Sequence, residues 1–84
     1  MAHAWVYILR CRDGSLYTGW SSDLERRLAR HRAGTASRYT ASRRPVELVY
    51  AVATGDRSAA RREEARIKTL DRAAKLALIE AAHA

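Results

Sequence analysis

Apolar and polar side chains divide the chain into segments typical of strands and helices. Residues 4–11 are rich in aromatic and β-branched side chains, as strands are. Residues 15 to 19 or 20 repeat this character after Asp13-Gly14, a dipeptide that favours a hairpin turn. Residues 46–53 are mostly apolar and predict a third strand that is well buried.

Helical periodicity fills most of the remaining chain. Leu24, Leu28 and His31 fall on one stripe of a helix over residues 23–32, and Gly34 follows as a C-cap residue. A second helix begins at a cap residue near position 56 or 58 and ends near position 70, and a third covers positions 71 to 82. The third helix turns two apolar side chains inward, Leu76 and Ile79.

The order strand, strand, helix, strand, helix, helix predicts the fold class. We expect one α/β domain over residues 1–84, with a small three-stranded, mainly antiparallel sheet flanked by helices. The single cysteine, Cys11, excludes a disulfide framework and a cysteine zinc site within one chain. No apolar run is long enough to span a membrane and no signal-peptide pattern opens the chain, so we expect a cytoplasmic protein without a membrane partner.

The hairpin turn decides which side chains share a face of the sheet. A two-residue loop would leave Tyr7 and Tyr17 on opposite faces, because a shift of one residue in register reverses the side of every side chain. A three-residue loop over residues 12–14, with Gly14 in the left-handed conformation, would set Tyr7 opposite Gly19 and bring both tyrosines to one face. We predict the three-residue loop, on the premise that the two tyrosines act together.

Charge favours a polyanionic partner. The formal net charge is +7 and the sequence pI is near 10.5. Such a surface attracts nucleic acid, since each phosphate contact releases counterions. Residues 35–44 show no apolar periodicity and predict a basic loop, which would either line a nucleic-acid groove or simply be solvated. Candidate nucleic-acid contacts are Arg38, Tyr39, Arg43 and Arg44, together with Trp20, which could stack on a base or pack in the core.

Arg27 and His31 lie one turn apart on the first predicted helix and can face one target together. A guanidinium and an imidazole beside the strand-end Tyr17 would make a phosphodiester site. The same residues also suit an ordinary amphipathic helix, with Arg27 extended along its apolar neighbours and His31 favoured by the helix dipole. His31 is a candidate base, because imidazole titrates near neutral pH.

The ordered set of Tyr7, Tyr17-Thr18-Gly19, Arg27 and a later helical glutamate resembles the GIY-YIG nuclease superfamily. The resemblance extends from about residue 5 to residue 79 and is strongest to the small single-domain bacterial members. Two departures occur: the first signature reads Trp-Val-Tyr and the second Tyr-Thr-Gly. Trp5 replaces the glycine of the first signature, and the two isoleucine positions carry the β-branched Val6 and Thr18, while both signatures keep the tyrosine.

The resemblance implies a metal-dependent nuclease that hydrolyses DNA phosphodiester bonds, in DNA repair or processing, with one Mg²⁺ or Mn²⁺ ion. It assigns Tyr7 or Tyr17 to the attacking water, Arg27 to the scissile phosphate and Glu64 to the metal. An acid four residues before a lysine is the family pattern, which selects Glu64. The helical wheel places Glu63 nearer the middle of the apolar face, so Glu63 remains the alternative.

Intrinsic sequence specificity should be low in a single domain, and a homodimer or a partner protein could supply it. The alternative function is a nucleic-acid-binding module that keeps the fold and has little or no catalysis. Binding alone would not require the carboxylate, so the complete set of four residues favours the nuclease.

Overall fold

Three antiparallel strands form one sheet in the computed structural model, which describes residues 3–83. The central strand is β1 (Ala4–Arg10), with β2 (Leu16–Ser21) on one side and β3 (Glu47–Thr54) on the other. β3 pairs with β1 through an irregularity in register next to Ile8. The sheet is antiparallel throughout, as the sequence predicts.

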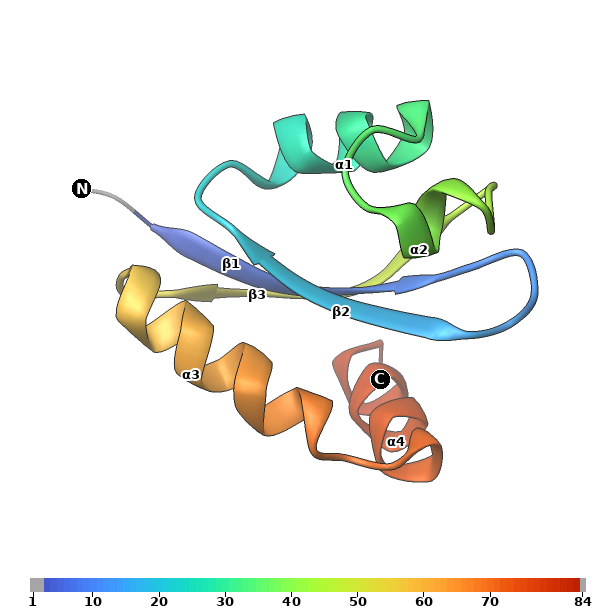
Figure 1. The fold of residues 1–84 in the computed structure, drawn as a ribbon. Helices are drawn as coiled ribbons and strands as arrows, with labels where there is room; N and C mark the ends of the chain where they lie inside the picture. The colour runs from blue at the N-terminus through green and yellow to red at the C-terminus, as the bar shows by residue number, and fades with distance from the viewer. Residues whose placement is uncertain (1–2, 84) are drawn as a thin grey trace.

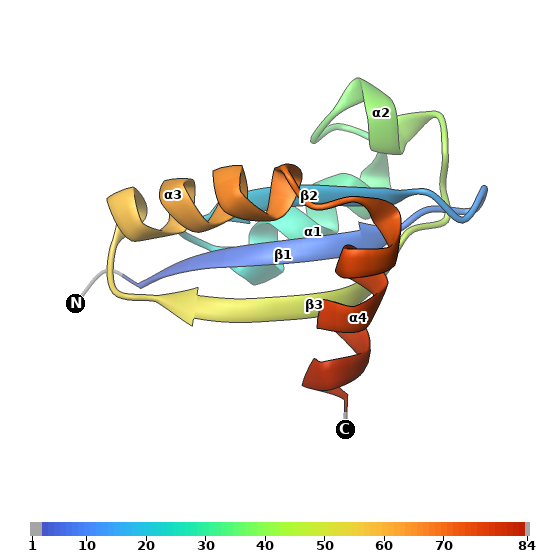
Figure 2. The ribbon, with the colours of Figure 1, turned by 90° about the horizontal axis from the view of Figure 1, so that it is seen from below.

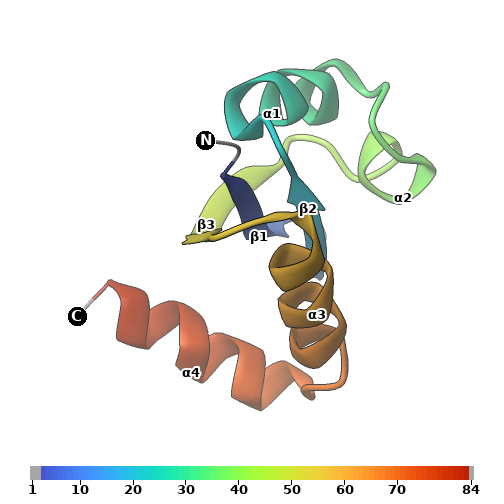
Figure 3. The ribbon, with the colours of Figure 1, turned by 90° about the vertical axis from the view of Figure 1, so that its left-hand side faces the viewer.

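Helices cover both faces of the sheet. α1 (Leu24–Ala33) and α2 (Arg38–Ala41) lie on one face, and α3 (Arg57–Lys68) and α4 (Arg72–Ala82) lie on the other (Figures 1 and 3). Figure 2 shows α3 running along β2, whereas α4 crosses toward β3 at a steep angle. The fold class is therefore confirmed: a three-stranded sheet between two layers of helices.

The hairpin has the three-residue loop that the sequence predicts. Gly14 has a φ of 85°, in the left-handed region that favours glycine. Tyr7 pairs with Gly19 and Leu9 pairs with Tyr17. Both tyrosines consequently face the α1 side of the sheet.

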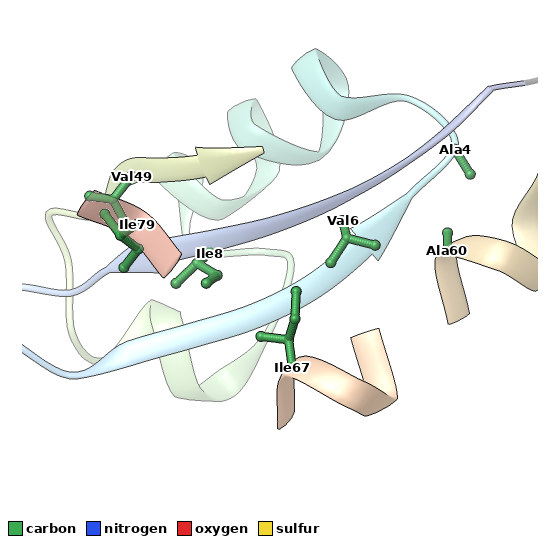
Figure 4. Packing of buried hydrophobic residues seen from close by; sticks show 7 residues of the cluster. All are labelled: Ala4, Val6, Ile8, Val49, Ala60, Ile67 and Ile79. Carbon is green, nitrogen blue, oxygen red and sulfur yellow. The ribbon is translucent and has the colours of Figure 1, made fainter. Parts of the chain in front are cut away.

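The main core lies on the α3/α4 side of the sheet. Its members come from β1, β3 and the two helices, and Figure 4 shows them pointing toward one another: Ala4, Val6, Ile8, Val49, Ala60, Ile67 and Ile79. Trp20 packs against this cluster from β2, on the face opposite to the tyrosines. A smaller cluster of Tyr7, Leu9 and Leu28 joins β1 to α1 on the other face.

Caps fix where the helices begin. The side chains of Asp23, Asp56 and Asp71 accept hydrogen bonds from backbone N–H groups at the starts of α1, α3 and α4. At the other end of α1, Gly34 has a φ of 81° and closes the helix, as predicted. Among residues 3–83, no helix is both long and apolar enough to cross a lipid bilayer.

Three sequence predictions about local structure are wrong. The segment 35–44 contains a helical turn, α2, because Ser37 caps it with a hydrogen bond from the Thr40 N–H. The third strand is buried only at Val49, because it lies at an edge of the sheet and its other residues reach solvent. Leu76 is exposed, since α4 meets the sheet mainly through Ile79.

Candidate active site

Two phenols and one imidazole meet on the α1 side of the sheet. The Tyr7 hydroxyl lies 2.7 Å from Nε2 of His31. The His31 ring meets both tyrosine rings edge-on, with centroids 5.6 Å from Tyr7 and 5.3 Å from Tyr17. We call these three side chains the phenol–imidazole cluster. The strand register brings the tyrosines together, and the helical stripe of α1 brings His31 to them.

Gly19 provides the space that Tyr7 occupies. A Cβ atom at this position would lie 2.6 Å from the Tyr7 hydroxyl oxygen and 2.7 Å from Cζ. No real side chain fits at such distances, so the Tyr7 ring lies across the bare backbone of β2. The predicted register already pairs Gly19 with Tyr7, and this pairing is the signal that the glycine leaves space for the Tyr7 ring.

The Tyr7 phenol is held in its protonated form. Burial raises its pKa to about 12, and the nearby Tyr17 phenol adds to the rise. Arg27 opposes this through its positive charge and its N–H groups, and Glu64 contributes a smaller rise. The charges of Arg27 and Glu64 and the Tyr17 phenol therefore all influence the pKa of Tyr7.

Arg27 extends from α1 with a partly buried side chain. The ion pairs within residues 3–83 are Arg43–Asp13, Arg66–Glu63 and Lys68–Glu64, so none of them neutralises Arg27. Arg27 also lines a polar pocket of about 380 Å³ beside the start of α1. The other lining residues are Ser21, Ser22, Asp23, Arg26 and Arg30. Three guanidinium groups around one cavity favour an anionic ligand.

His31 is 1% exposed and uses both ring nitrogens. Nε2 meets Tyr7, and Nδ1 lies 2.9 Å from Oγ1 of Thr40 on α2. Burial lowers the pKa of His31, and the charges of Arg27 and Arg30 lower it further. The imidazole is therefore neutral at pH 7.

The two candidate glutamates have different surroundings. Glu63 receives two hydrogen bonds from Arg66, at 2.6 and 2.9 Å, which lower its pKa. Its charge acts on Tyr50, which packs against the core on the α3/α4 side. Glu64 pairs with Lys68 at 3.3 Å, and its charge acts on Tyr7. The electrostatic contact with the phenol–imidazole cluster thus belongs to Glu64.

The site offers a divalent ion one protein carboxylate, that of Glu64. Residues 3–83 contain no group of three or more His, Cys, Asp or Glu side chains that could enclose a metal. Glu64, a substrate phosphate and water would supply hard oxygen ligands. Mg²⁺ commonly binds in this way, through one or two carboxylates and substrate phosphates with several retained waters. This chemistry is compatible with a hard divalent ion.

Two of the predicted nucleic-acid contacts, Tyr39 and Arg43, lie beside the phenol–imidazole cluster. Tyr39 stacks on Tyr17 with ring centroids 5.9 Å apart, and the Arg43 guanidinium lies 3.8 Å from the Tyr39 centroid. Arg43 is also bound to Asp13 at 3.1 Å. These contacts make a stacked column that continues the cluster outward, with Tyr39 38% exposed at the surface.

The remaining predicted contacts lie elsewhere. Arg44 donates to the carbonyl oxygens of Ala41 and Arg32, which ties α2 to the end of α1. Arg38 is exposed on α2. Trp20 lies on the opposite face of the sheet and does not join the cluster.

Sequence reasoning missed the two hydroxyl residues behind His31. Thr40 is fully buried and contacts both His31 and Ser37. The segment looked like a loop, so neither hydroxyl was assigned a position. The available signal was Ser37 itself, an N-cap residue type three positions before Thr40.

Comparisons with known proteins find related sequences and similar folds. A family model described as the GIY-YIG catalytic domain matches residues 3–77. A UPF0213 protein of Staphylococcus haemolyticus is 49% identical over 80 residues, covering 95% of this chain and 98% of that protein. The solution NMR structure of a UPF0213 protein from Bacillus halodurans has a TM-score of 0.61 and 40% identity, covering 93% of this chain and 83% of that one. A solution NMR structure of a protein from E. faecalis has a TM-score of 0.67 and 38% identity, covering 99% and 88%.

Proposed function

Because this chain belongs to the GIY-YIG catalytic domain family, a family of endonucleases, we propose that it hydrolyses DNA phosphodiester bonds with the help of one divalent ion, Mg²⁺ or Mn²⁺. One observation carries the proposal: Tyr7 and Tyr17 both contact His31, and the charges of Arg27 and Glu64 both influence the pKa of Tyr7. Phosphodiester hydrolysis needs a base for water, positive charge at the phosphate and help for the leaving oxygen. The site has a candidate for each.

Arg27 would bind the scissile phosphate. Its guanidinium has five N–H donors in a fixed planar arrangement, which suits the oxygens of a phosphate. No carboxylate within residues 3–83 neutralises it, so its charge is free to stabilise the negative charge that develops on the phosphoryl oxygens.

The protonated state of Tyr7 sets the route of the proton. A phenol with a pKa of about 12 cannot by itself take a proton from water at neutral pH. Nε2 of His31 lies 2.7 Å away and can accept the phenolic proton while the phenol oxygen accepts one from the attacking water. Tyr17, on the same face, would orient that water or the phosphate.

Glu64 would hold the divalent ion. When bound, the ion supplies positive charge that stabilises the phosphoryl oxygens and the leaving oxygen. Nζ of Lys68 lies 3.3 Å from Oε2 of Glu64. A metal ion that binds Glu64 would therefore compete with this ion pair. The competition predicts modest metal affinity without substrate and tighter binding once a phosphate adds its oxygens.

The polar pocket beside Arg27 would take the neighbouring phosphate of the strand. Arg26 and Arg30 of α1 line it together with Arg27. A strand that places its scissile phosphate on Arg27 would continue over this pocket. These contacts are independent of base sequence, which is consistent with low intrinsic specificity. A homodimer or a partner protein would then supply a preference for particular sites.

Nicking of supercoiled plasmid tests the proposal. The parent protein should nick DNA with Mg²⁺ or Mn²⁺ and should be inactive with EDTA. Tyr17→Phe, Arg27→Ala and Glu64→Ala should each lower the rate by about 100-fold or more, as loss of a transition-state contact does. Equal rates for the parent and all three variants would reject this site. DNA binding that weakens with salt, without cleavage, would instead support a binding module.

A further inference from the structure

A continuous row of hydrogen bonds leads from the cluster into α2. His31 Nδ1 lies 2.9 Å from Oγ1 of Thr40, and this oxygen lies 2.8 Å from Oγ of Ser37. Ser37 is held in place because its Oγ also accepts the Thr40 backbone N–H at 3.1 Å. Thr40 is 0% exposed, so its hydroxyl has no access to bulk water.

A neutral imidazole carries one ring N–H, which leaves two arrangements of the row. In the first, Nε2–H donates to the Tyr7 oxygen, and Thr40 donates to a bare Nδ1. In the second, Tyr7 donates to a bare Nε2, and Nδ1–H donates to Thr40. The burial of Tyr7 decides between these arrangements.

Tyr7 is 0% exposed, and the hydrogen bond of its hydroxyl within residues 3–83 is the one to His31. In the first arrangement the phenol oxygen would accept the Nε2 proton, and the O–H of Tyr7 would have no acceptor. Buried hydroxyls rarely remain unpaired in this way.

The second arrangement satisfies every group. The Tyr7 O–H donates to Nε2, Nδ1–H donates to Thr40, and the Thr40 O–H donates to Ser37, whose Oγ and carbonyl oxygen are both within reach at 2.8 and 3.5 Å. All three protons then point the same way along the row, from Tyr7 toward Ser37.

We propose that Thr40, supported by Ser37, is a positioning residue that fixes His31 in the Nδ1-protonated tautomer. Nε2 then remains free to accept the phenolic proton of Tyr7. When that proton moves, the O–H bond of Tyr7 breaks, an N–H bond forms at Nε2, and the cationic ring keeps its existing hydrogen bond to Thr40. The consequence for catalysis rests on the proposed nuclease function, but the assignment of the tautomer does not.

Other groups around His31 do not supply this control. Tyr17 meets the ring only at its edge, through an aromatic contact. The charges of Arg27 and Arg30 act on the imidazole and disfavour its cationic form, but they do not select one nitrogen through a hydrogen bond. Thr40 is the residue that contacts Nδ1 directly.

Long-range ¹H–¹⁵N NMR spectra of the imidazoles test the tautomer without any activity. We expect the parent protein and Thr40→Ser to show His31 protonated at Nδ1. Thr40→Val keeps the shape and removes the hydroxyl, so it should populate the Nε2-protonated form. A parent protein protonated at Nε2 would overturn the proposal even if Thr40→Val failed to fold, and so would a folded Thr40→Val with an unchanged tautomer.

Plasmid nicking measures the consequence for catalysis. Thr40→Val should lower the turnover rate about tenfold or more without changing the DNA concentration at half-maximal rate, and Thr40→Ser should restore it. A merely structural role would change thermal stability without this separation and without a change of tautomer. If the parent protein does not nick DNA, the nuclease proposal fails while the NMR result still decides the tautomer.

Discussion

The Tyr7 hydroxyl and the His31 imidazole form a buried hydrogen bond, 2.7 Å long, between the central strand and the first helix. One partner has a raised pKa and the other a lowered one, so burial keeps both groups uncharged at pH 7. An uncharged donor and acceptor at this distance can exchange a proton when a substrate changes the local charge. The same pairing has consequences for stability.

The lowered pKa of His31 predicts loss of stability in acid. Its ordinary value is 6.5, and the folded state holds it lower because of burial and two nearby arginines. Below pH 6.5 the unfolded chain therefore binds a proton more readily than the folded chain does. Stability should be full above pH 6.5 and fall as the pH drops through the folded value.

Thermal melts from pH 8 to pH 5 would check this prediction. The melting temperature of the parent protein should fall more steeply below pH 6.5 than that of His31→Gln, which cannot titrate. Parallel curves for the parent protein and His31→Gln would contradict the assignment.

Gly19→Ala should displace the Tyr7 ring. The added Cβ would lie 2.6 Å from the phenol oxygen, so the ring must shift and its hydrogen bond to His31 must break. Overpacking of this kind costs about 1–3 kcal/mol. The matched control is Gly55→Ala, because a Cβ at Gly55 meets nothing within 4 Å. We expect a lower melting temperature and a changed His31 NMR signal only for Gly19→Ala.

The sequence was sufficient to predict the fold and the hairpin register. Asp13-Gly14 marks the turn, and requiring two tyrosines on one face selects the three-residue loop. The stripe of Leu28 and His31 likewise predicted which side of α1 is buried, because helical spacing is a local property. These features depend on residues near one another in the chain.

Features that depend on distant contacts were harder to predict. α2 has only four residues, and its position depends on Thr40 meeting His31 and on Arg43 meeting Asp13. The exposure of β3 depends on its place at the sheet edge, which composition does not reveal. The charge of Glu64 acts on Tyr7 and that of Glu63 acts on Tyr50, on opposite faces of the sheet. A helical wheel does not show which strand residues lie near each glutamate, so it could not separate the two.

The two glutamates should respond differently to substitution. Glu64→Gln should remove the one carboxylate within residues 3–83 whose charge acts on Tyr7, and the rate of nicking with Mg²⁺ should fall about 100-fold or more. Glu63→Gln loses its ion pair with Arg66, a largely exposed contact worth at most about 1 kcal/mol, and should keep most of the activity. Nicking rates at increasing Mg²⁺ would check both, and the opposite result would move the metal site to Glu63.

Thr18→Val should stabilise the protein. Thr18 Oγ1 is the one buried side-chain oxygen or nitrogen in residues 3–83 that has no hydrogen-bond partner. A buried unpaired hydroxyl costs about 1–3 kcal/mol, and valine keeps the shape and removes it. We expect the free energy of unfolding to rise by about 1 kcal/mol and the melting temperature by about 4–8 °C.

Thr54→Val provides the matched control for this substitution. The Thr54 hydroxyl lies 2.8 Å from the carbonyl oxygen of Ala4 and 3.1 Å from that of Asp56. Its loss should lower the melting temperature. If Thr18→Val also lowered it, the Thr18 hydroxyl would have a partner in solution, such as a buried water.

The arginines beside Arg27 should determine how strongly DNA binding depends on salt. Arg26 and Arg30 line the polar pocket, and no ion pair within residues 3–83 neutralises them. Each phosphate contact on duplex DNA contributes about 0.9 to the slope of log affinity against log salt. Arg26→Gln and Arg30→Gln should each reduce that slope by about one, for any DNA sequence.

Arg61→Gln is the control for these two variants. Arg61 lies in α3, on the other side of the sheet, and its substitution should leave the slope unchanged. Fluorescence anisotropy in EDTA, from 50 to 300 mM NaCl, measures binding without cleavage, and equal slopes for all three variants would exclude the pocket from the DNA path.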